Sequence, residues 1–572
     1  MGKSEDLERK ARFLGRHPAA QKCAHTGRVL VEKRGFCYPF SVKKILFAAG
    51  ILSIVFPAVW VIAQQDAPPN TEFVIAYSPT AIVLNPLKSY AATEAQIFTA
   101  MYEGLVTYNP SSLDPVPAAA SSWNVSADGK TYTFRLREDA RYVNGDPVSA
   151  GDFKASWLKF LDPRIKAEYS FLYDIIKGAR DYRTGLNPDP ESVGIKVLSP
   201  SRLQVVLEEP ATYFLKILCH HSFLPMHPSM LMHEDWNSLP EIIGNGAYRL
   251  VRHDSNQILF EKNPHYWDAA NVKIPAIRIT FIEDGDEIIR GFNNYEIHWA
   301  ASAQSLDKIL YQDTIIINPL FATSYFYFVN ADPPWNNEKI RRALALLIPW
   351  QLMRSRSFQF LPAKTLVPSI PGYPAPEAIV ETGKEEALRL LLDSGFPEGR
   401  GLPPLLIKIP KDPESMRLAS TMAAAWKEQG IESEIKTYPF SQYFDVLKEN
   451  DFTLGIMTWI ADFADPLAFL QMWTSSNNLN TGRYTDTGYD ELIRKSMGQS
   501  GEERYKTLSA AESVLLKTAQ VLPIGHNPAI NLIDLQFIDG WYQNPLDIHP
   551  FKYLGFAPYK PLKGVVRFNP VP

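Results

Sequence analysis

One aspartate stands out as a candidate ligand-binding group because it directly follows an apolar segment. Residues 452–459 are largely apolar and predict a buried strand that runs into Ala461 and Asp462. In an open parallel sheet, ligands bind beyond the carboxyl ends of the strands, so the pattern places Asp462 at a cleft. A carboxylate in a closed, dry cleft strongly prefers a cationic partner, because an unpaired buried charge is costly. The alternative is a local cap or ion pair for Asp462, and we expect Asp465 to be a turn residue.

Other residues that could bind a ligand or take part in a reaction do not form a recognisable catalytic, metal or nucleotide site. Four histidines lie close together in the sequence: His220, His221, His227 and His233. Their spacing lacks a regular ligand pattern, and two prolines between them break any helical face. The chain contains no G-x-S-x-G, H-E-x-x-H or G-x-x-x-x-G-K-[ST] motif. We therefore expect no bound metal and no cofactor, and any ATP hydrolysis must belong to a partner protein.

Composition predicts two or three folded domains. The 572 residues are 46% hydrophobic and 21% charged, which is typical of a globular chain that can fill more than one core. Residues 1–63 contain eleven Lys or Arg and four Asp or Glu, so with an overall formal charge of −4 the rest of the chain carries −11. An acidic folded region argues against nucleic acid as a partner.

The N-terminal region predicts export from the cytoplasm. Two lysines precede the uncharged run 45–63, and Pro57 ends its apolar core. Small residues at Val61-Ile62-Ala63 suit a signal peptidase, so we predict a signal sequence that is cleaved after Ala63. The alternative is an uncleaved membrane anchor with a basic cytoplasmic tail of 44 residues. Both interpretations place residues 64–572 outside the cytoplasm.

The cysteines predict neither a disulfide in the exported part nor a lipid anchor. The chain has three, Cys23, Cys37 and Cys219, and only Cys219 follows the apolar run. A periplasmic protein of this size has enough core to fold without a disulfide.

Two regions of the chain predict different architectures. A helix that Thr93 can cap, a hairpin turn at Asp128-Gly129, a strand at 131–136 and a helix that begins at Ser149 indicate a compact α+β unit. Further along, strands alternate with helices, which implies a parallel sheet with right-handed crossovers. The predicted helices of this second region are 384–394, 414–429 and 441–449, and the predicted strands are 404–409, 431–436 and 452–459.

Several motifs follow one another with the order and spacing of a known family. They include YEGLVTYNP (102–110), NGAYRL (245–250), NPHYWD (263–268), WIADFADP (459–466) and NTGRYTDTGYDELI (480–493). Through them the chain resembles the extracytoplasmic oligopeptide-binding proteins of ABC importers, the solute-binding proteins of family 5. The resemblance covers nearly everything after residue 70. It implies an α/β protein with the two-lobe, hinged type II fold of periplasmic binding proteins and an extra small α+β domain on the first lobe.

The resemblance also implies a discontinuous first lobe. Its main domain would consist of residues 64–102, 190–320 and 535–572, with 103–189 as the added small domain. Residues 321–534 would form the second α/β lobe, and the segments near residues 321 and 535 would act as the hinge. Residues 1–63 would be the basic tail with the signal sequence or anchor.

The same resemblance implies a set of ligand-binding residues. The family's W-x-A-D motif matches residues 459–462, and its aspartate looks like the group that pairs with the α-ammonium of a peptide. Peptide binding without sequence choice needs main-chain hydrogen bonds, as when a strand is added to a sheet edge. One side of such a site would be Thr458, Trp459 and Ile460, and the other Tyr90, Ala91 and Ala92. Three aromatic residues are further candidates, each nearly as well explained as core: Tyr169, Phe440 and His526.

We therefore predict a monomeric, non-enzymatic receptor that closes around a peptide and delivers it to the membrane permease of an ABC importer. Family members that hold the far carboxylate often place arginines just before W-x-A-D, whereas residues 452–456 contain no cation. This departure favours longer peptides, an apolar ligand or another amine over free tripeptides. Alternative ligands are a sugar, a metal chelate or another nutrient. A hydrolase would need a nucleophile with its base or a metal site, which the motifs do not show.

Overall fold

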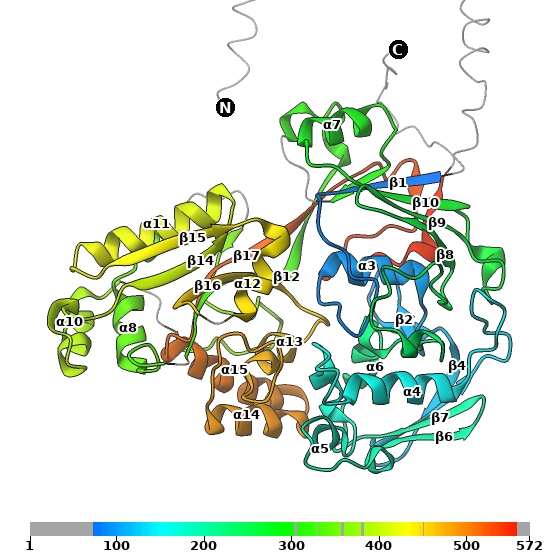
Figure 1. Cartoon of the computed structure of the whole chain (residues 1–572), viewed down its shortest axis with the longest axis horizontal. Coiled ribbons are helices and arrows are strands. Elements are labelled where there is room, and N and C mark those ends of the chain that lie inside the picture. Colours follow the sequence, from blue (N-terminus) through cyan, green and yellow to red (C-terminus); the bar gives the residue numbers. More distant parts are fainter. Residues whose placement is uncertain are drawn as a thin grey trace, which may run out of the picture. The chain divides into compact units, whose positions relative to one another are not determined.

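The first lobe is built around parallel strands from distant parts of the chain. In the computed structural model, β1 (Glu72–Tyr77) pairs in parallel with β10 (Ala276–Phe281) and with β11 (Trp299–Ala301), as Figure 1 shows for blue β1 beside green β10. The other elements of this lobe are β8 (Tyr248–His253), β9 (Gln257–Lys262), α3 (Ala92–Met101), α6 (Phe214–Ile217), α7 (Gly285–Asn293), β18 (Ile538–Asp539) and β19 (Gly555–Phe556). The structure describes residues 72–301, 306–330, 332–355, 360–378, 382–449 and 451–557.

The predicted N-terminal segment cannot be compared with the structure. Residues 1–63, with the signal sequence or anchor at 45–63, lie outside the described residues. None of the helices in the described part of the chain is long and apolar enough to cross a membrane.

A separate antiparallel sheet marks the small α+β domain. Its strand order is β4 (Ala120–Val125), β5 (Thr131–Leu136), β7 (Arg202–Val206) and β6 (Ile195–Ser199). The sheet packs with α4 (Ala150–Leu161), whose predicted start is confirmed by a capping box between Ser149 and Asp152. Other elements of this region are β2 (Val106–Tyr108), β3 (Pro115–Pro117) and α5 (Ala179–Arg183). Because β6 and β7 follow residue 189, where the sequence analysis ended this domain, we propose a boundary after β7.

The second lobe confirms the predicted alternation of strands and helices. Strand β14 (Leu405–Pro410) pairs in parallel with β15 (Ser433–Tyr438) on one side and with β16 (Leu454–Ile460) on the other. The bounds predicted for these strands and for α10 (Lys384–Asp393), α11 (Pro413–Lys427) and α12 (Phe440–Lys448) are displaced by two residues or fewer. The remaining elements are α8 (Glu338–Leu346), α9 (Trp350–Met353), β13 (Leu361–Pro362), α13 (Leu467–Leu470), α14 (Thr487–Met497) and α15 (Gly501–Lys517).

Two long strands join the lobes. Strand β12 (Ile315–Phe328) pairs antiparallel with β17 (Val521–Ile533) along most of its length, and the two run between the lobes in Figure 1. Strand β17 also pairs with β11 of the first lobe, and β12 pairs with β16 of the second. Among the described residues, one sheet therefore has the order β15-β14-β16-β12-β17-β11-β1-β10-β9-β8, with β13 beside β17.

The pairing of these long strands is irregular between the lobes. Pro319 lies opposite Pro528, and the register shifts before Thr323 pairs with His526. Because proline has no N–H to donate, the ladder is weakened at this point. The irregularity lies close to residue 321, and we propose it as the place where the lobes bend relative to each other.

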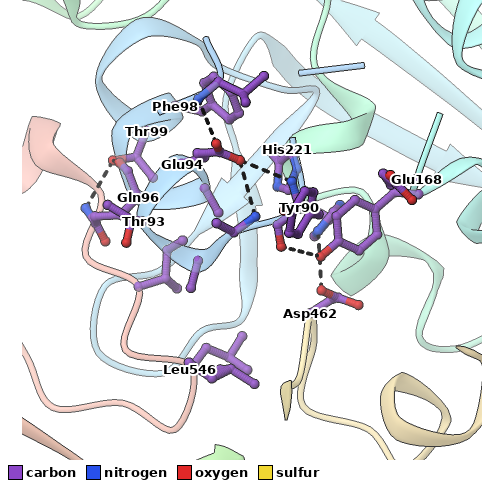
Figure 2. Close-up of a pocket in the computed structure, with 18 of the residues that line it drawn as sticks. Tyr90, Thr93, Glu94, Gln96, Phe98, Thr99, Glu168, His221, Asp462 and Leu546 are labelled. Atoms are coloured by element: carbon purple, nitrogen blue, oxygen red, sulfur yellow. Dashed lines mark hydrogen bonds and ion pairs between the residues drawn. The ribbon is translucent and has the colours of Figure 1, made fainter. Parts of the chain in front are cut away.

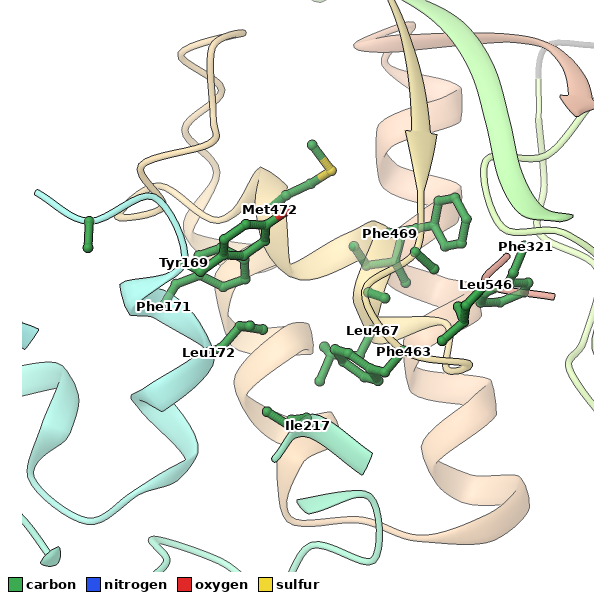
Figure 3. Packing of buried hydrophobic residues seen from close by; sticks show 14 of the residues in the cluster. Tyr169, Phe171, Leu172, Ile217, Phe321, Phe463, Leu467, Phe469, Met472 and Leu546 are labelled. Carbon is green, nitrogen blue, oxygen red and sulfur yellow. The ribbon is translucent and has the colours of Figure 1, made fainter. Parts of the chain in front are cut away.

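Buried apolar side chains from both lobes belong to one continuous core cluster. Figure 3 shows Tyr169, Leu172 and Ile217 of the first lobe and small domain near Phe463 and Met472 of the second lobe, all members of that cluster. The structure thus holds the two lobes against each other.

Candidate ligand-binding site

A cavity of about 1110 Å³ lies between the two lobes. The first lobe lines it with the start of α3 and the loop before it, and the second lobe lines it with α12 and the end of β16. Small-molecule pockets usually have volumes of about 300–1,000 Å³, so this cavity has room for more than a drug-sized molecule.

Asp462 faces this cavity without a cationic partner. Its side chain is only 6% exposed, and the Nε2 atom of His220 lies 3.6 Å from Oδ1. The second oxygen, Oδ2, has no hydrogen-bond partner among the described residues. Burial raises the pKa of Asp462 to about 8, because a charged carboxylate is unfavourable where water is excluded. The site therefore favours a ligand that brings a positive charge close to Asp462.

His220 cannot satisfy that demand as a cation. Its side chain is buried, and this burial lowers its pKa to about 3. Its Nδ1 atom accepts a hydrogen bond from the Ser222 backbone N–H at 3.3 Å, so the ring proton belongs on Nε2, which faces Asp462. A neutral imidazole can orient the carboxyl group, but it cannot compensate the charge of its ionised form.

The loop before α3 forms the opposite wall. The Glu94 carboxylate accepts hydrogen bonds from the backbone N–H groups of Val83 (2.7 Å), Tyr90 (3.1 Å) and Ala91 (3.2 Å), which fixes the backbone of this loop. The residue predicted to cap the helix, Thr93, lies inside it instead, because the helix already begins at Ala92. The prediction of the cap was therefore wrong, and Glu94 is the residue that organises this helix start.

Tyr169 connects this wall to Asp462. Its buried hydroxyl lies 3.3 Å from the backbone oxygen of Tyr90 and also forms a side-chain hydrogen bond with the Asp462 carboxyl group. A single hydroxyl thus joins groups of both lobes at the cavity wall.

The end of β16 offers an unpaired strand edge to the cavity. On one side Thr458, Trp459 and Ile460 pair with β12, whereas β14 pairs with β16 only at Leu454 and Gly455. Beyond these two residues, the edge opposite β12 has no strand partner in the described part of the chain. The Trp459 indole is fixed by donating to the Ala468 backbone oxygen at 3.0 Å. Such an edge can accept main-chain hydrogen bonds from an extended ligand.

The structure brings together most of the residues that the sequence singled out. The cavity is lined by Tyr90, Ala91, Ala92, Tyr169, Phe440, Thr458, Trp459, Ile460 and Asp462. It is not lined by His526, whose Nδ1 atom lies 2.9 Å from the Thr323 hydroxyl within the β12–β17 pairing. The reason is that β17 continues the sheet at this point, so His526 meets a neighbouring strand instead of the ligand space.

The histidines considered for a metal have other partners. His220 and His221 pack ring against ring with centroids 4.1 Å apart, while His227 lies 3.0 Å from Asp146 and His233 is exposed. Within the described ranges, no group of three or more His, Cys, Asp or Glu residues is placed to hold a metal ion.

Contacts between the second lobe and the small domain at the cavity wall could not be predicted from the sequence. Lys448 of α12 forms an ion pair with Glu168 of the small domain at 3.0 Å and lies 4.8 Å from the centre of the Tyr90 ring. The Asn478 amide donates to the Ala167 backbone oxygen at 2.9 Å. No sequence pattern links residues that lie so far apart in the chain.

Asp465 also has a larger role than the predicted turn. Its Oδ1 atom accepts a hydrogen bond from the Leu467 N–H, as a turn residue would. The carboxylate also forms a buried bidentate ion pair with Arg504, with N···O distances of 2.7 and 2.8 Å.

Comparison with known proteins identifies the family. Residues 114–481 match the family model of bacterial extracellular solute-binding proteins, family 5. The chain belongs to this family. Its relatives include the dipeptide-binding protein DppE of Bacillus subtilis, which is 28% identical over 77% of this chain and 84% of DppE. The structure of Haemophilus influenzae OppA in complex with the peptide RPPGFSPFR is 25% identical, with a TM-score of 0.77, and the match covers 85% of this chain and 99% of OppA.

Two structures of a third relative match the same fold. The murein tripeptide-binding protein MppA of Escherichia coli matches with a TM-score of 0.78 at 24% identity, over 85% of this chain and 99% of MppA. An MppA structure described as the unliganded open form scores 0.58 at 23% identity, over 85% and 97% of the two chains. The fold is therefore the two-lobe type II fold of this family.

Proposed function

We propose that this protein is a non-enzymatic, extracytoplasmic receptor that binds peptides between its lobes and delivers them to the permease of an ABC importer. The names of DppE, OppA and MppA, which all refer to peptide ligands, support this proposal. As further parts of the proposal, the receptor is a periplasmic monomer, and residues 45–63 act as its cleaved signal sequence.

The observation that carries the proposal is the buried carboxyl group of Asp462, whose Oδ2 atom has no partner among the described residues, beside the edge of β16 that no strand covers. A peptide has an α-ammonium group at the start of a chain of main-chain donors and acceptors. We infer that the ammonium pairs with Asp462 while the following peptide groups pair with Thr458, Trp459 and Ile460. Tyr90, Ala91 and Ala92 would contact the peptide from the other lobe, and Tyr169 would position the carboxylate.

Binding measurements on an Asp462→Asn variant test this function. Titration calorimetry with tetra- and pentaalanine should show micromolar or tighter binding to the wild-type protein. Loss of a buried charge-assisted contact costs about 2–5 kcal/mol, which corresponds to a loss of affinity of roughly 30-fold to several thousand-fold. The matched control is Asp445→Asn, because Asp445 also lines the cavity but has an 81% exposed side chain.

Two results would contradict the proposal. Equal affinity of the wild-type protein and Asp462→Asn would remove Asp462 from the ammonium site. A sugar or metal chelate as the sole ligand in mass spectra of the purified protein would replace the peptide by another solute.

A further inference from the structure

A second carboxylate faces the cavity from the first lobe. Asp547 lines the cavity, and its side chain is 21% exposed. Its Oδ1 atom lies 2.9 Å from Nδ2 of Asn531 and 3.1 Å from Nε2 of His549. No hydrogen bond joins its other oxygen, Oδ2, to the described residues. One oxygen is therefore anchored, and the other remains available to a ligand.

The Asn531 contact is a hydrogen bond of fixed direction. The indole N–H of Trp299 can only donate, and it donates to Oδ1 of Asn531 at 2.8 Å. The Asn531 amide must then present its NH₂ group to Asp547. The Asp547 oxygen is consequently an acceptor.

His549 contacts the same oxygen through a buried ring. The ring is 1% exposed, stacks on Trp541 with centroids 4.2 Å apart, and has no partner for its Nδ1 atom in the described part of the chain. In the described part of the chain, Asp547 and Asp462 therefore share one arrangement: each lies beside a buried histidine, and no Lys or Arg side chain pairs with either carboxyl group.

The loop that carries Asp547 is held rigidly. Asn544 bonds through its side chain to the backbone of Tyr542, Leu546 and Ile548, and the Gln96 side chain of α3 bonds to both backbone groups of His549. Asp547 itself has a φ of 50°, a left-handed conformation that aspartate tolerates better than most residues. Figure 2 includes Leu546 of this loop among the residues around the pocket. The carboxylate is thus positioned before any ligand arrives.

Other charges of the cavity wall do not neutralise these two carboxylates. Glu103 pairs with Lys552 at 2.6 Å, and Glu168 pairs with Lys448 at 3.0 Å. The remaining lysines of the wall, at positions 88 and 166, are exposed, and no ion pair joins either of them to Asp462 or Asp547. A peptide with only an α-ammonium group would satisfy one carboxylate and leave the other facing the closed cavity.

We propose that Asp547 forms a second cation-binding subsite, so that the preferred ligand is a peptide with a lysine or arginine side chain in addition to its α-ammonium group. This inference rests on the proposed peptide-binding function and narrows its ligand class. The Asp547 subsite would select peptides that carry a positively charged side chain. The free edge of β16 would bind the main chain of any peptide.

A lysine scan of a neutral peptide tests the subsite. Pentaalanine carrying a single lysine at position 2, 3, 4 or 5 is compared by calorimetry with peptides that carry norleucine, the uncharged analogue, at the same position. At one position or more, the wild-type protein should bind the lysine peptide at least tenfold more tightly. Asp547→Asn should reduce this preference to less than twofold and keep the affinity for the norleucine peptide, because asparagine keeps the shape and tolerates the left-handed backbone.

The controls separate the subsite from the peptide site as a whole. Asp445→Asn should keep the lysine preference, whereas Asp462→Asn should weaken both peptide series. Equal affinities of lysine and norleucine peptides at all four positions would overturn the inference alone, as would a preference that survives in Asp547→Asn. If no peptide of either series binds the wild-type protein, both the inference and the proposed function fail.

Discussion

Removing the α-amino group from a bound peptide should make its binding depend strongly on pH. In the closed cavity, burial raises the pKa of Asp462 to about 8, compared with roughly 3.9 for an exposed aspartate. An intact peptide supplies a cation, so the carboxylate stays ionised in the complex. A des-amino peptide, with hydrogen in place of the amino group, supplies none. Closure around it must then be accompanied by protonation of Asp462.

The magnitude follows from linkage between protonation and closure. Because the pKa in the closed state lies above the pKa in the open state, closure around a neutral ligand is favoured at low pH and weakens as pH rises from about 4 to about 8. Between these limits each pH unit changes the affinity about tenfold. From pH 5 to pH 7 the des-amino peptide should lose roughly 80-fold in affinity, or about 2.6 kcal/mol. The intact peptide should change little, since its ammonium and the carboxylate both stay charged over this range.

Calorimetry at pH 5, 6 and 7 in buffers of different ionisation enthalpy measures both quantities. At pH 7 the des-amino peptide should take up about one proton per molecule bound, and the intact peptide close to none. Asp462→Asn should abolish both the pH slope and the proton uptake. The reasoning is refuted if the des-amino peptide binds equally well at all three pH values, or if the slope persists in Asp462→Asn.

Three further predictions concern closure, stability and export. Replacing Lys448 by methionine removes its partly exposed ion pair with Glu168 at the cavity wall. Peptide affinity in calorimetry should therefore fall by at most about 1 kcal/mol, and high salt should produce a similar fall in the wild-type protein. A larger, salt-independent loss would contradict this expectation. Replacing Asp465 by asparagine leaves the buried Arg504 without its partner, so urea unfolding should show a loss of about 3–5 kcal/mol, and an unchanged midpoint would argue against the pair. N-terminal sequencing of the exported protein should begin at Gln64, whereas a membrane-bound product that retains residues 45–57 would establish the anchor.

Local patterns in the sequence determined many of the elements. The capping box at Ser149 and the alternation of apolar strands with amphipathic helices after residue 384 are set by neighbouring residues, and the structure confirms both. The apolar strand that leads to Asp462 could be predicted for the same reason. A run of apolar residues followed by a charged residue is recognised from neighbouring residues alone. The motifs also pointed to the family, which the match over residues 114–481 confirms.

The tertiary structure decided which distant residues meet. Strand β17 joins the sheet between β12 and β11, so its residue His526 faces a neighbouring strand, and β6 and β7 extend the small sheet beyond its expected end. The residues that contact the carboxyl groups of Asp462 and Asp547 could not be identified from the sequence either. His220 reaches Asp462 from the other lobe, and Asn531 holds Asp547 from a strand of the central sheet.

These contacts could not be predicted because their energy depends on burial, which the whole fold creates. A carboxylate, a histidine or an asparagine has the same local pattern whether it is exposed or lines a closed cavity. The sequence by itself therefore determined the elements, the family and the position of Asp462 at a strand end. Only the packing of two lobes around one cavity excluded water from Asp462 and left it, like Asp547, without a cation, which is the physical basis for the ligand chemistry proposed for this protein.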